Sequence, residues 1–163
     1  MVFAASGDRS VSDIATEVLF YHLERQPLER VLPNLLERTL QRGWRAVVQA
    51  GSTERLEALD AHLWTYADDS FLPHGTTKDG APDRQPILLT TGPENPNGAG
   101  VRFLLDGADI ETYAGYVRIV VIFDGRDEDA LALARAQWQR AREQGSKATY
   151  WRQSDAGRWE QKA

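Results

Sequence analysis

The chain has 163 residues, of which 42% are hydrophobic and 26% charged, a composition ordinary for a soluble globular protein of one domain. It has no cysteine, which excludes disulfides and thiolate metal sites and fits a reducing cytoplasm, and it has no apolar run of the roughly 18 residues that predict a membrane span. The net charge of −5 argues against a surface that binds nucleic acid as a whole.

The first elements expected are a polar arm, a strand, a helix and a second strand. Residues 1–15 are small and polar and predict a flexible N-terminal arm. EVLFYHL at 17–23 is a β-rich apolar run, and the leucines on one side of residues 28–42 predict a helix that Gly43 ends. RAVVQA at 45–50 predicts a buried strand.

A second helix follows, capped by Ser52 or Thr53. Its pattern consists of Leu56, Leu59, His62 and Leu63. Residues 67–85 then contain two prolines and two glycines and predict a long loop.

The second half of the chain repeats the alternation of strand and helix. Strands are predicted at 86–91, 101–107 and 116–125, a turn-rich loop at 92–100, a long helix at 127–144, and a terminal hairpin from 148–153 and 157–161. Because strands alternate with helices, the sequence predicts one α/β domain over residues 16–163. The expected architecture is a three-layer Rossmann-like fold, with a mostly parallel central sheet and helices on both faces.

Motifs for cofactors and catalysis are missing. The turn after the first strand lacks the glycines of nucleotide-binding loops, and His22, His62 and His74 have no metal-ligand spacing, so we expect no cofactor and no metal. The pairs Asp68–Asp69 and Asp106–Asp109 are the kind that loops collect for structural reasons. A non-catalytic binding module is therefore favoured, and a small nucleotide-binding enzyme or regulator on the same fold is the alternative.

Charge is concentrated near the C-terminal end. Residues 135–158 contain the basic residues Arg135, Arg140, Arg142, Lys147, Arg152 and Arg158 against Glu143 and Asp155. Such a segment predicts a local anion-binding patch, although a solvated helix face with scattered arginines explains the charges equally well.

Several motifs together resemble one family. FYHL (20–23), LDAHLWTY (59–66), SFLPHG (70–75), PILLT (86–90) and LARAQWQRARE (133–143) are similar in order and spacing to the chi subunit of bacterial DNA polymerase III, across roughly residues 16–155. The resemblance implies a non-catalytic, cytoplasmic accessory subunit associated with the replisome. It joins the clamp loader, through the subunit psi, to the acidic C-terminal tail of single-stranded DNA-binding protein (SSB), and meets DNA only through SSB.

The resemblance implies that the tail site lies on the last helix and the strand after it. Arg135 matches the arginine that grips the tail carboxylate, and Trp138 stands where an aromatic wall is expected, although packing in the core would explain this tryptophan as well. Leu131 and Gln139 occupy positions where the family leads us to expect lysines, so Arg142 or Arg140 is expected to supply charge instead. Lys147 and Arg152 are expected to steer the acidic stretch before the tail end.

The segment around Phe71 matches the family's second surface, which binds psi and is also thought to bind a helicase. The residues expected there are Trp64, Phe71, Leu72, Pro73 and His74. An exposed phenylalanine between turn residues has little structural purpose unless a partner covers it. The competing interpretation is that Phe71 packs beneath its own loop.

Overall fold

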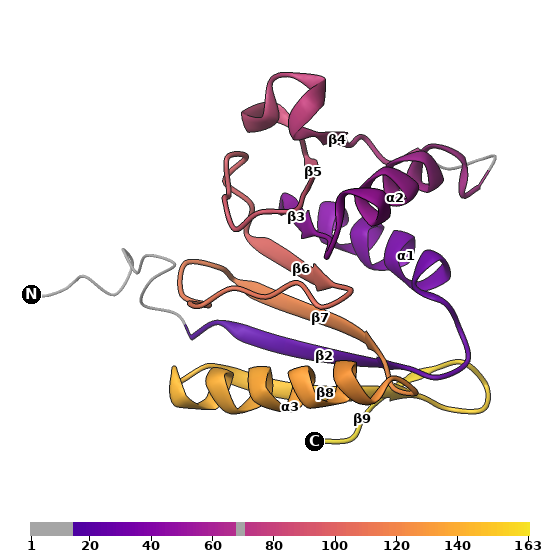
Figure 1. Ribbon diagram of the computed structural model, residues 1–163, viewed down its shortest axis with the longest axis vertical. Helices are drawn as coiled ribbons and strands as arrows, with labels where there is room; N and C mark the ends of the chain where they lie inside the picture. The colour runs from indigo at the N-terminus through magenta and orange to yellow at the C-terminus, as the bar shows by residue number, and fades with distance from the viewer. Residues whose placement is uncertain (1–14, 68–70) are drawn as a thin grey trace, which may run out of the picture.

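The computed structural model of the protein describes residues 15–67 and 71–163 (Figure 1). The predicted arm, apart from its last residue, and the pair Asp68–Asp69 lie outside the described residues. Within the described ranges, no helix combines the length and the apolarity needed to cross a membrane.

One sheet of eight strands organises the described residues, in the order β4-β5-β3-β6-β7-β2-β8-β9. The strands are β2 (Glu17–Leu23), β3 (Ala46–Gln49), β4 (Gly75–Thr76), β5 (Ile87–Thr90), β6 (Val101–Leu105), β7 (Arg118–Asp124), β8 (Lys147–Gln153) and β9 (Trp159–Gln161). All neighbouring pairs are parallel except β8 and β9. The predicted mostly parallel α/β sheet is confirmed.

The predicted terminal hairpin forms as β8 and β9, but it is not a separate unit. Strand β8 also pairs in parallel with β2, in a register that sets Phe20 beside Tyr150 and Tyr21 beside Trp151. The hairpin therefore extends the main sheet, and β2 lies in its interior between β7 and β8.

The three described helices are α1 (Leu28–Gln41), α2 (Thr53–Thr65) and α3 (Glu128–Glu143). Their ends follow local chemistry. Gly43 takes a φ of 82° after α1, a conformation that glycine adopts without a Cβ penalty. Ser52, rather than Thr53, caps α2 by accepting a hydrogen bond from the Arg55 N–H, and the Asp127 carboxylate accepts two at the start of α3.

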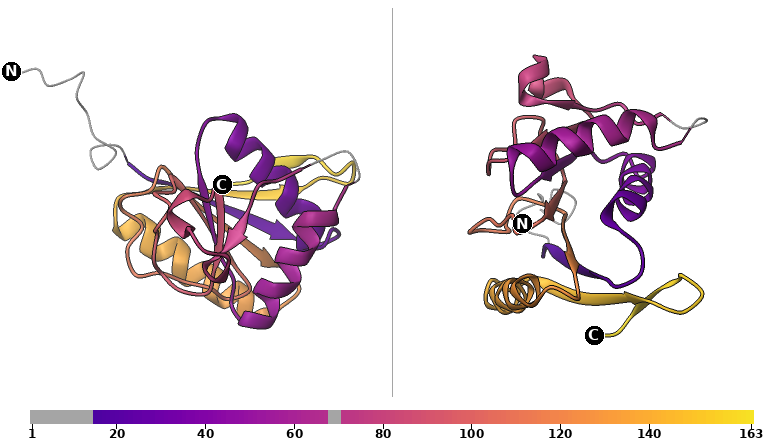
Figure 2. Two further views of the ribbon diagram at one scale, coloured as in Figure 1. Left: turned by 90° about the horizontal axis from the view of Figure 1, so that it is seen from above. Right: turned by 45° about the vertical axis from the view of Figure 1, so that its right-hand side comes forward.

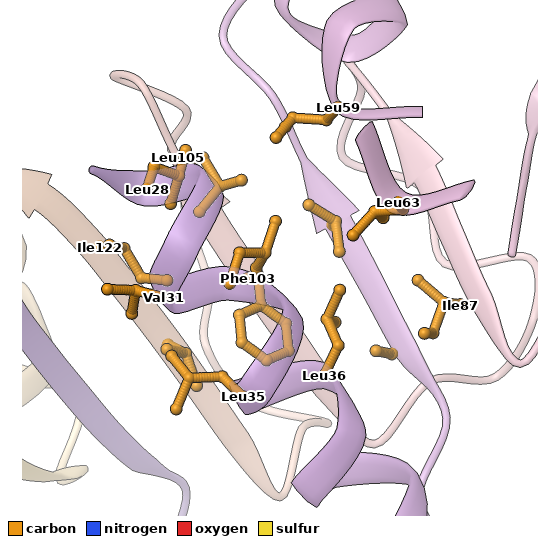
Figure 3. Packing of buried hydrophobic residues seen from close by; sticks show 14 of the residues in the cluster. Leu28, Val31, Leu35, Leu36, Leu59, Leu63, Ile87, Phe103, Leu105 and Ile122 are labelled. Carbon is orange, nitrogen blue, oxygen red and sulfur yellow. The ribbon is translucent and has the colours of Figure 1, made fainter. Parts of the chain in front are cut away.

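Helices cover both faces of the sheet, which confirms the three-layer prediction. Helices α1 and α2 lie on one side and α3 lies on the other (Figure 2, right). The core on the first side packs α1 and α2 residues such as Leu36 and Leu63 against Phe103 of β6 (Figure 3). The core on the α3 side includes Phe20 and Ile119.

The prediction of an unbroken loop over residues 67–85 is wrong in part. Gly75 and Thr76 form the edge strand β4, which pairs in parallel with β5, and two 3-10 turns follow at Thr77–Asp79 and Pro82–Arg84. Glycine and proline mark turns, but they do not reveal that a two-residue stretch within the segment meets a sheet edge.

Candidate functional site

A hollow of about 470 Å³, which we call the α3 cavity, lies between α3 and strands β2, β7 and β8. It is lined by Phe20, Phe123, Leu131, Ala134, Arg135, Trp138, Gln139, Tyr150 and Ala163. Four of the seven residues predicted for the tail site are therefore brought together: Leu131, Arg135, Trp138 and Gln139.

The helix pattern explains why these side chains meet. Residues three, four and seven apart share one face of an α-helix, so Leu131, Ala134, Arg135 and Trp138 point to the same side of α3. The Trp138 ring lies 5.4 Å, centroid to centroid, from Phe20 at an interplanar angle of 55° and is half-buried. Trp138 is thus both a packing residue and a wall of the cavity.

Arg135 supplies positive charge at the rim of the α3 cavity. Its side chain is exposed, and none of the described carboxylates lies in ion-pair range of it. Arg135 and Tyr150 line the same cavity, and the Arg135 charge opposes the rise that burial causes in the pKa of Tyr150. An unpaired guanidinium beside aromatic walls can bind a carboxylate and seat an apolar group at once.

The floor of the α3 cavity is aromatic and held by a buried histidine. The Tyr150 hydroxyl and His22 Nδ1 are hydrogen-bonded, and the His22 ring also packs edge-on against Phe123 at 5.2 Å. Gly125 permits this packing, because a Cβ there would lie 1.7 Å from His22 Nε2. The sequence prediction missed Phe20, Phe123 and Tyr150, although the alternation of side chains along the strands that contain them was a usable signal.

The other predicted tail-site residues do not line the cavity. Arg142 is exposed near the end of α3 without an ion-pair partner in the described ranges. Arg152 forms an ion pair with Glu24. Lys147 borders a groove on the opposite face of the sheet.

Arg140, which was considered as a substitute source of charge, is already engaged. Its guanidinium donates hydrogen bonds to both carboxylate oxygens of Asp109 at 2.8 Å and to the Ile110 carbonyl. Of the two arginines considered, Arg142 alone remains available to an anion near the α3 cavity.

The second predicted surface has an exposed aromatic pair, Trp64 and Phe71, which we call the Trp64–Phe71 patch. The exposed fraction of Phe71 is 70% and that of Trp64 is 51%, and their ring centroids lie 5.8 Å apart. They are the large hydrophobic side chains that stay exposed in the described part of the chain. Phe71 therefore does not pack beneath its own loop.

The remaining residues predicted for this surface lie beneath it. Leu72 and His74 are buried, and Pro73 is half-buried. His74 Nδ1 donates to the Leu72 carbonyl at 2.7 Å, its Nε2 lies 3.1 Å from the Asp60 carboxylate, and its ring lies 4.1 Å from Trp64. These contacts hold the loop that presents Phe71.

Of the histidines and aspartates considered for catalysis or metal binding, His62 and Asp106 also have structural partners. His62 Nε2 bonds to the Glu29 carbonyl, and Asp106 forms an ion pair with Arg55. No group of three metal-ligating side chains occurs in the ranges 15–67 and 71–163.

A hollow of about 560 Å³ lies at the carboxyl ends of β2, β6 and β7, the place where doubly wound α/β folds bind nucleotides. Its acidic lining residues are Glu29, Asp106, Asp124, Asp127 and Asp129, and its basic ones are Arg55 and Arg126. Excess negative charge repels phosphate, and this disfavours the alternative of a nucleotide-binding protein.

Comparison with known proteins agrees with the motifs. The family model described as "DNA polymerase III chi subunit, HolC" matches residues 15–149. A protein of Rickettsia prowazekii (strain Madrid E) named "Probable DNA polymerase III subunit chi" is 30% identical over 111 residues, which cover 64% of this chain and 67% of that protein.

Proposed function

Because the chain belongs to the DNA polymerase III chi subunit family, we propose that it is a non-catalytic adaptor of the polymerase III holoenzyme. It links the clamp loader, through psi, to the acidic C-terminal tail of SSB during DNA replication. On this proposal, residues 16–163 act as one domain in the cytoplasm and reach template DNA chiefly through SSB.

The observation that carries the proposal is Arg135, which has no ion-pair partner among the described residues and lies at the rim of the aromatic α3 cavity. An SSB tail ends in an apolar residue with a free carboxylate. On this proposal the guanidinium of Arg135 holds that carboxylate, and the rings of Trp138, Phe20 and Tyr150, which line the same cavity, contact the apolar side chain.

Electrostatics around the α3 cavity sets the expected binding behaviour. Leu131 and Gln139 contribute no charge, and Arg152 is neutralised by Glu24. Arg135 and Arg142 are then the main attraction for the acidic stretch that precedes the tail end. Because few charges take part, we expect binding that depends only modestly on ionic strength.

We assign psi to the Trp64–Phe71 patch, with a helicase as a second user of the same surface. Exposed aromatic anchors of this kind are typical centres of protein interfaces. The patch adjoins the end of α2, which packs near β5, whereas α3 packs against β7 and β8 (Figure 1). This separation supports simultaneous binding of both partners.

The test of the tail site is Arg135→Ala in a titration with an SSB tail peptide, measured by calorimetry. Loss of a hot-spot arginine is expected to weaken binding about 30-fold, which corresponds to about 2 kcal/mol. The fold should be unaffected because Arg135 is exposed and makes no ion pair with a described residue.

Arg30→Ala is the matched control. Arg30 is an exposed arginine on α1, on the other side of the sheet, and its substitution removes the same charge as Arg135→Ala does. Its affinity should equal that of the unmodified protein. Equal affinities for Arg135→Ala and Arg30→Ala would refute the assignment of the α3 cavity. Stabilisation by ATP or NAD, with none by the peptide, would favour the nucleotide-binding alternative.

A further inference from the structure

A second groove lies on the face of the sheet opposite α3, between α1 and strands β2, β8 and β9. Its volume is about 380 Å³, and we call it the β2–β8 groove. Its aromatic lining residues are Tyr21, Trp44, Phe103, Trp151 and Trp159, of which Phe103 is buried in the core, and its cationic ones are Arg38, Arg42, Arg118 and Lys147.

Strand alternation produces this surface. Tyr21 and Trp151 are register partners in β2 and β8, and both point away from α3, whereas Phe20 and Tyr150 point toward it. Helices α1 and α2 pack over β3 and β5 on this side of the sheet (Figure 2). Tyr21 and Trp159 pack partly against the core beneath α1, and Tyr21, Trp151 and Trp159 remain partly open to solvent.

Three rings form a continuous aromatic shelf in the β2–β8 groove. The rings of Tyr21 and Trp151 are stacked, with centroids 6.2 Å apart and an interplanar angle of 23°. Trp159 meets Tyr21 edge-on at 4.8 Å. All three are half-buried, so their positions are fixed by packing while part of each ring stays accessible.

The cations around the shelf are mostly unneutralised. Glu17 is the one acidic side chain lining the groove in the described ranges, and its carboxylate pairs with Arg118 at 3.1 Å. Arg38, Arg42 and Lys147 are exposed and have no ion-pair partner in residues 15–67 or 71–163. The groove therefore has a local positive excess on a chain whose net charge is −5.

Two contacts hold the arginines at the groove. The guanidinium carbons of Arg42 and Arg118 lie 5.5 Å and 5.2 Å from the centroid of the Trp44 ring. Arg38, Arg42 and Arg118 line the groove together with Tyr21, and their charges oppose the rise that burial causes in the pKa of Tyr21.

We propose that the β2–β8 groove binds single-stranded nucleic acid, with bases on the rings of Trp151 and Trp159 and phosphates on Arg38, Arg42 and Lys147. Aromatic rings interleaved with cations are the general chemistry of single-strand binding. An acidic peptide with one apolar residue at its end would use the cations and a single ring, whereas successive bases use several rings in a row, and a duplex would keep its bases stacked inside the helix. This goes beyond the adaptor role, in which DNA is reached through SSB.

The number of cations sets the strength expected. Each phosphate contact on a single strand contributes about −0.7 to the slope of log affinity against log salt, so three contacts predict a slope of about −2. Such a site binds weakly, with a dissociation constant on the order of 10⁻⁴ M at physiological salt, and becomes tighter at low salt. This weak affinity is sufficient for a protein that, on the proposed function, is already held at SSB-coated template.

The experiment titrates the full chain into a fluorescein-labelled oligo(dT) of about 15 nucleotides, a length that spans one single-strand site, and follows anisotropy at several salt concentrations. Arg38→Glu and Arg42→Glu should each weaken binding about tenfold and reduce the salt slope by about 0.7. Trp151→Leu should also weaken binding about tenfold, because a leucine offers no stacking face.

Arg30→Glu is the matched control. It makes the same charge change on the same helix, but it lies eight residues before Arg38, roughly 12 Å along the axis and beyond the Debye length of about 10 Å in 0.1 M salt. Its affinity should match that of the unmodified protein. Arg135→Ala should likewise bind the oligonucleotide normally, which separates this site from the α3 cavity.

Several results would overturn the proposal. One is an affinity for oligo(dT) that is the same in Arg30→Glu and Arg38→Glu, or the same in Trp151→Leu and the unmodified chain. Another is loss of SSB tail-peptide binding in Arg38→Glu with oligonucleotide binding intact, which would assign the groove to an acidic peptide. A dimer in sedimentation that Arg38→Glu dissociates would assign it to a second copy of the chain. Quenching of tryptophan emission by oligo(dT) in the unmodified protein supports the proposal without any variant.

Discussion

Phe71 and its neighbour Leu72 provide a sharp test of the Trp64–Phe71 patch, because substitution of the first should weaken partner binding and substitution of the second should lower stability. Phe71 is 70% exposed, so only about 30% of a side chain that typically buries about 200 Å² is covered, or roughly 60 Å². At about 25 cal/mol per Å², truncation to alanine costs at most about 1.5 kcal/mol of stability. Leu72 is 2% exposed, and Leu72→Ala should cost about 2–5 kcal/mol.

For binding to the clamp loader, Phe71→Ala should cause the larger loss and Leu72→Ala the smaller one. Phe71→Ala should weaken association with a psi-containing clamp loader by about 30-fold or more, equivalent to about 2 kcal/mol, because a central aromatic anchor is lost. Leu72→Ala should bind nearly normally whenever it is folded, since its side chain is not offered to a partner. Neither variant should change affinity for the SSB tail peptide.

The two quantities are measured separately. Urea unfolding followed by far-ultraviolet circular dichroism gives the free energy of unfolding, and calorimetry gives the affinity for the clamp loader and for the tail peptide. A loss of more than about 2 kcal/mol in the stability of Phe71→Ala would show that the ring packs in the fold. Unchanged clamp-loader affinity, or equal loss of both partners, would refute the two-surface arrangement.

Two further predictions concern buried polar groups. Arg102→Ala should lower the melting temperature measured by calorimetry by roughly 10 °C. The fully buried guanidinium donates hydrogen bonds to the Gln49 side chain, two loop carbonyls and the Tyr116 hydroxyl, and the substitution leaves all four without this donor. A change below about 2 °C would contradict the prediction. Burial, with help from Arg152 and against Asp124, lowers the pKa of His22 from its ordinary value of 6.5, so the fold favours the neutral ring. The urea midpoint of the unmodified protein should therefore fall as the pH drops below about 6.5, more steeply than that of His22→Phe, and parallel pH profiles would contradict the reasoning.

The secondary structure was largely predictable because its signals are local. Leucines on one side of residues 28–42, the cap at Ser52 and the acidic start before Glu128 each act within one or two turns. The resemblance implied that Leu131, Arg135 and Trp138 lie on the last helix, and the spacing of three, four and seven residues explains why they share one face of α3. For Phe71 the sequence left two interpretations, exposure and packing beneath its own loop, and only the structure decides for exposure.

Strand order and the partners of side chains were not predictable in this way. The pairing of β8 with β2 joins segments about 130 positions apart, and no local pattern encodes that register. It is this pairing that sets Tyr150 on the floor of the α3 cavity and Trp151 on the opposite face. The ion pair of Arg140 with Asp109 and the place of Lys147 across the sheet depend on the same long-range packing.

The sequence by itself thus determined the α/β class, most of the element boundaries and the family resemblance that sets Arg135 and Trp138 on the last helix, because periodicity, caps and motifs are properties of neighbouring residues. The tertiary structure alone decided which rings close the α3 cavity, which basic residues have no ion pair within the described ranges, and that a second aromatic and basic groove exists. Those features arise where strands distant in the chain become neighbours. Because successive side chains of a strand point to opposite faces of the sheet, the register of each strand decides on which face a side chain lies.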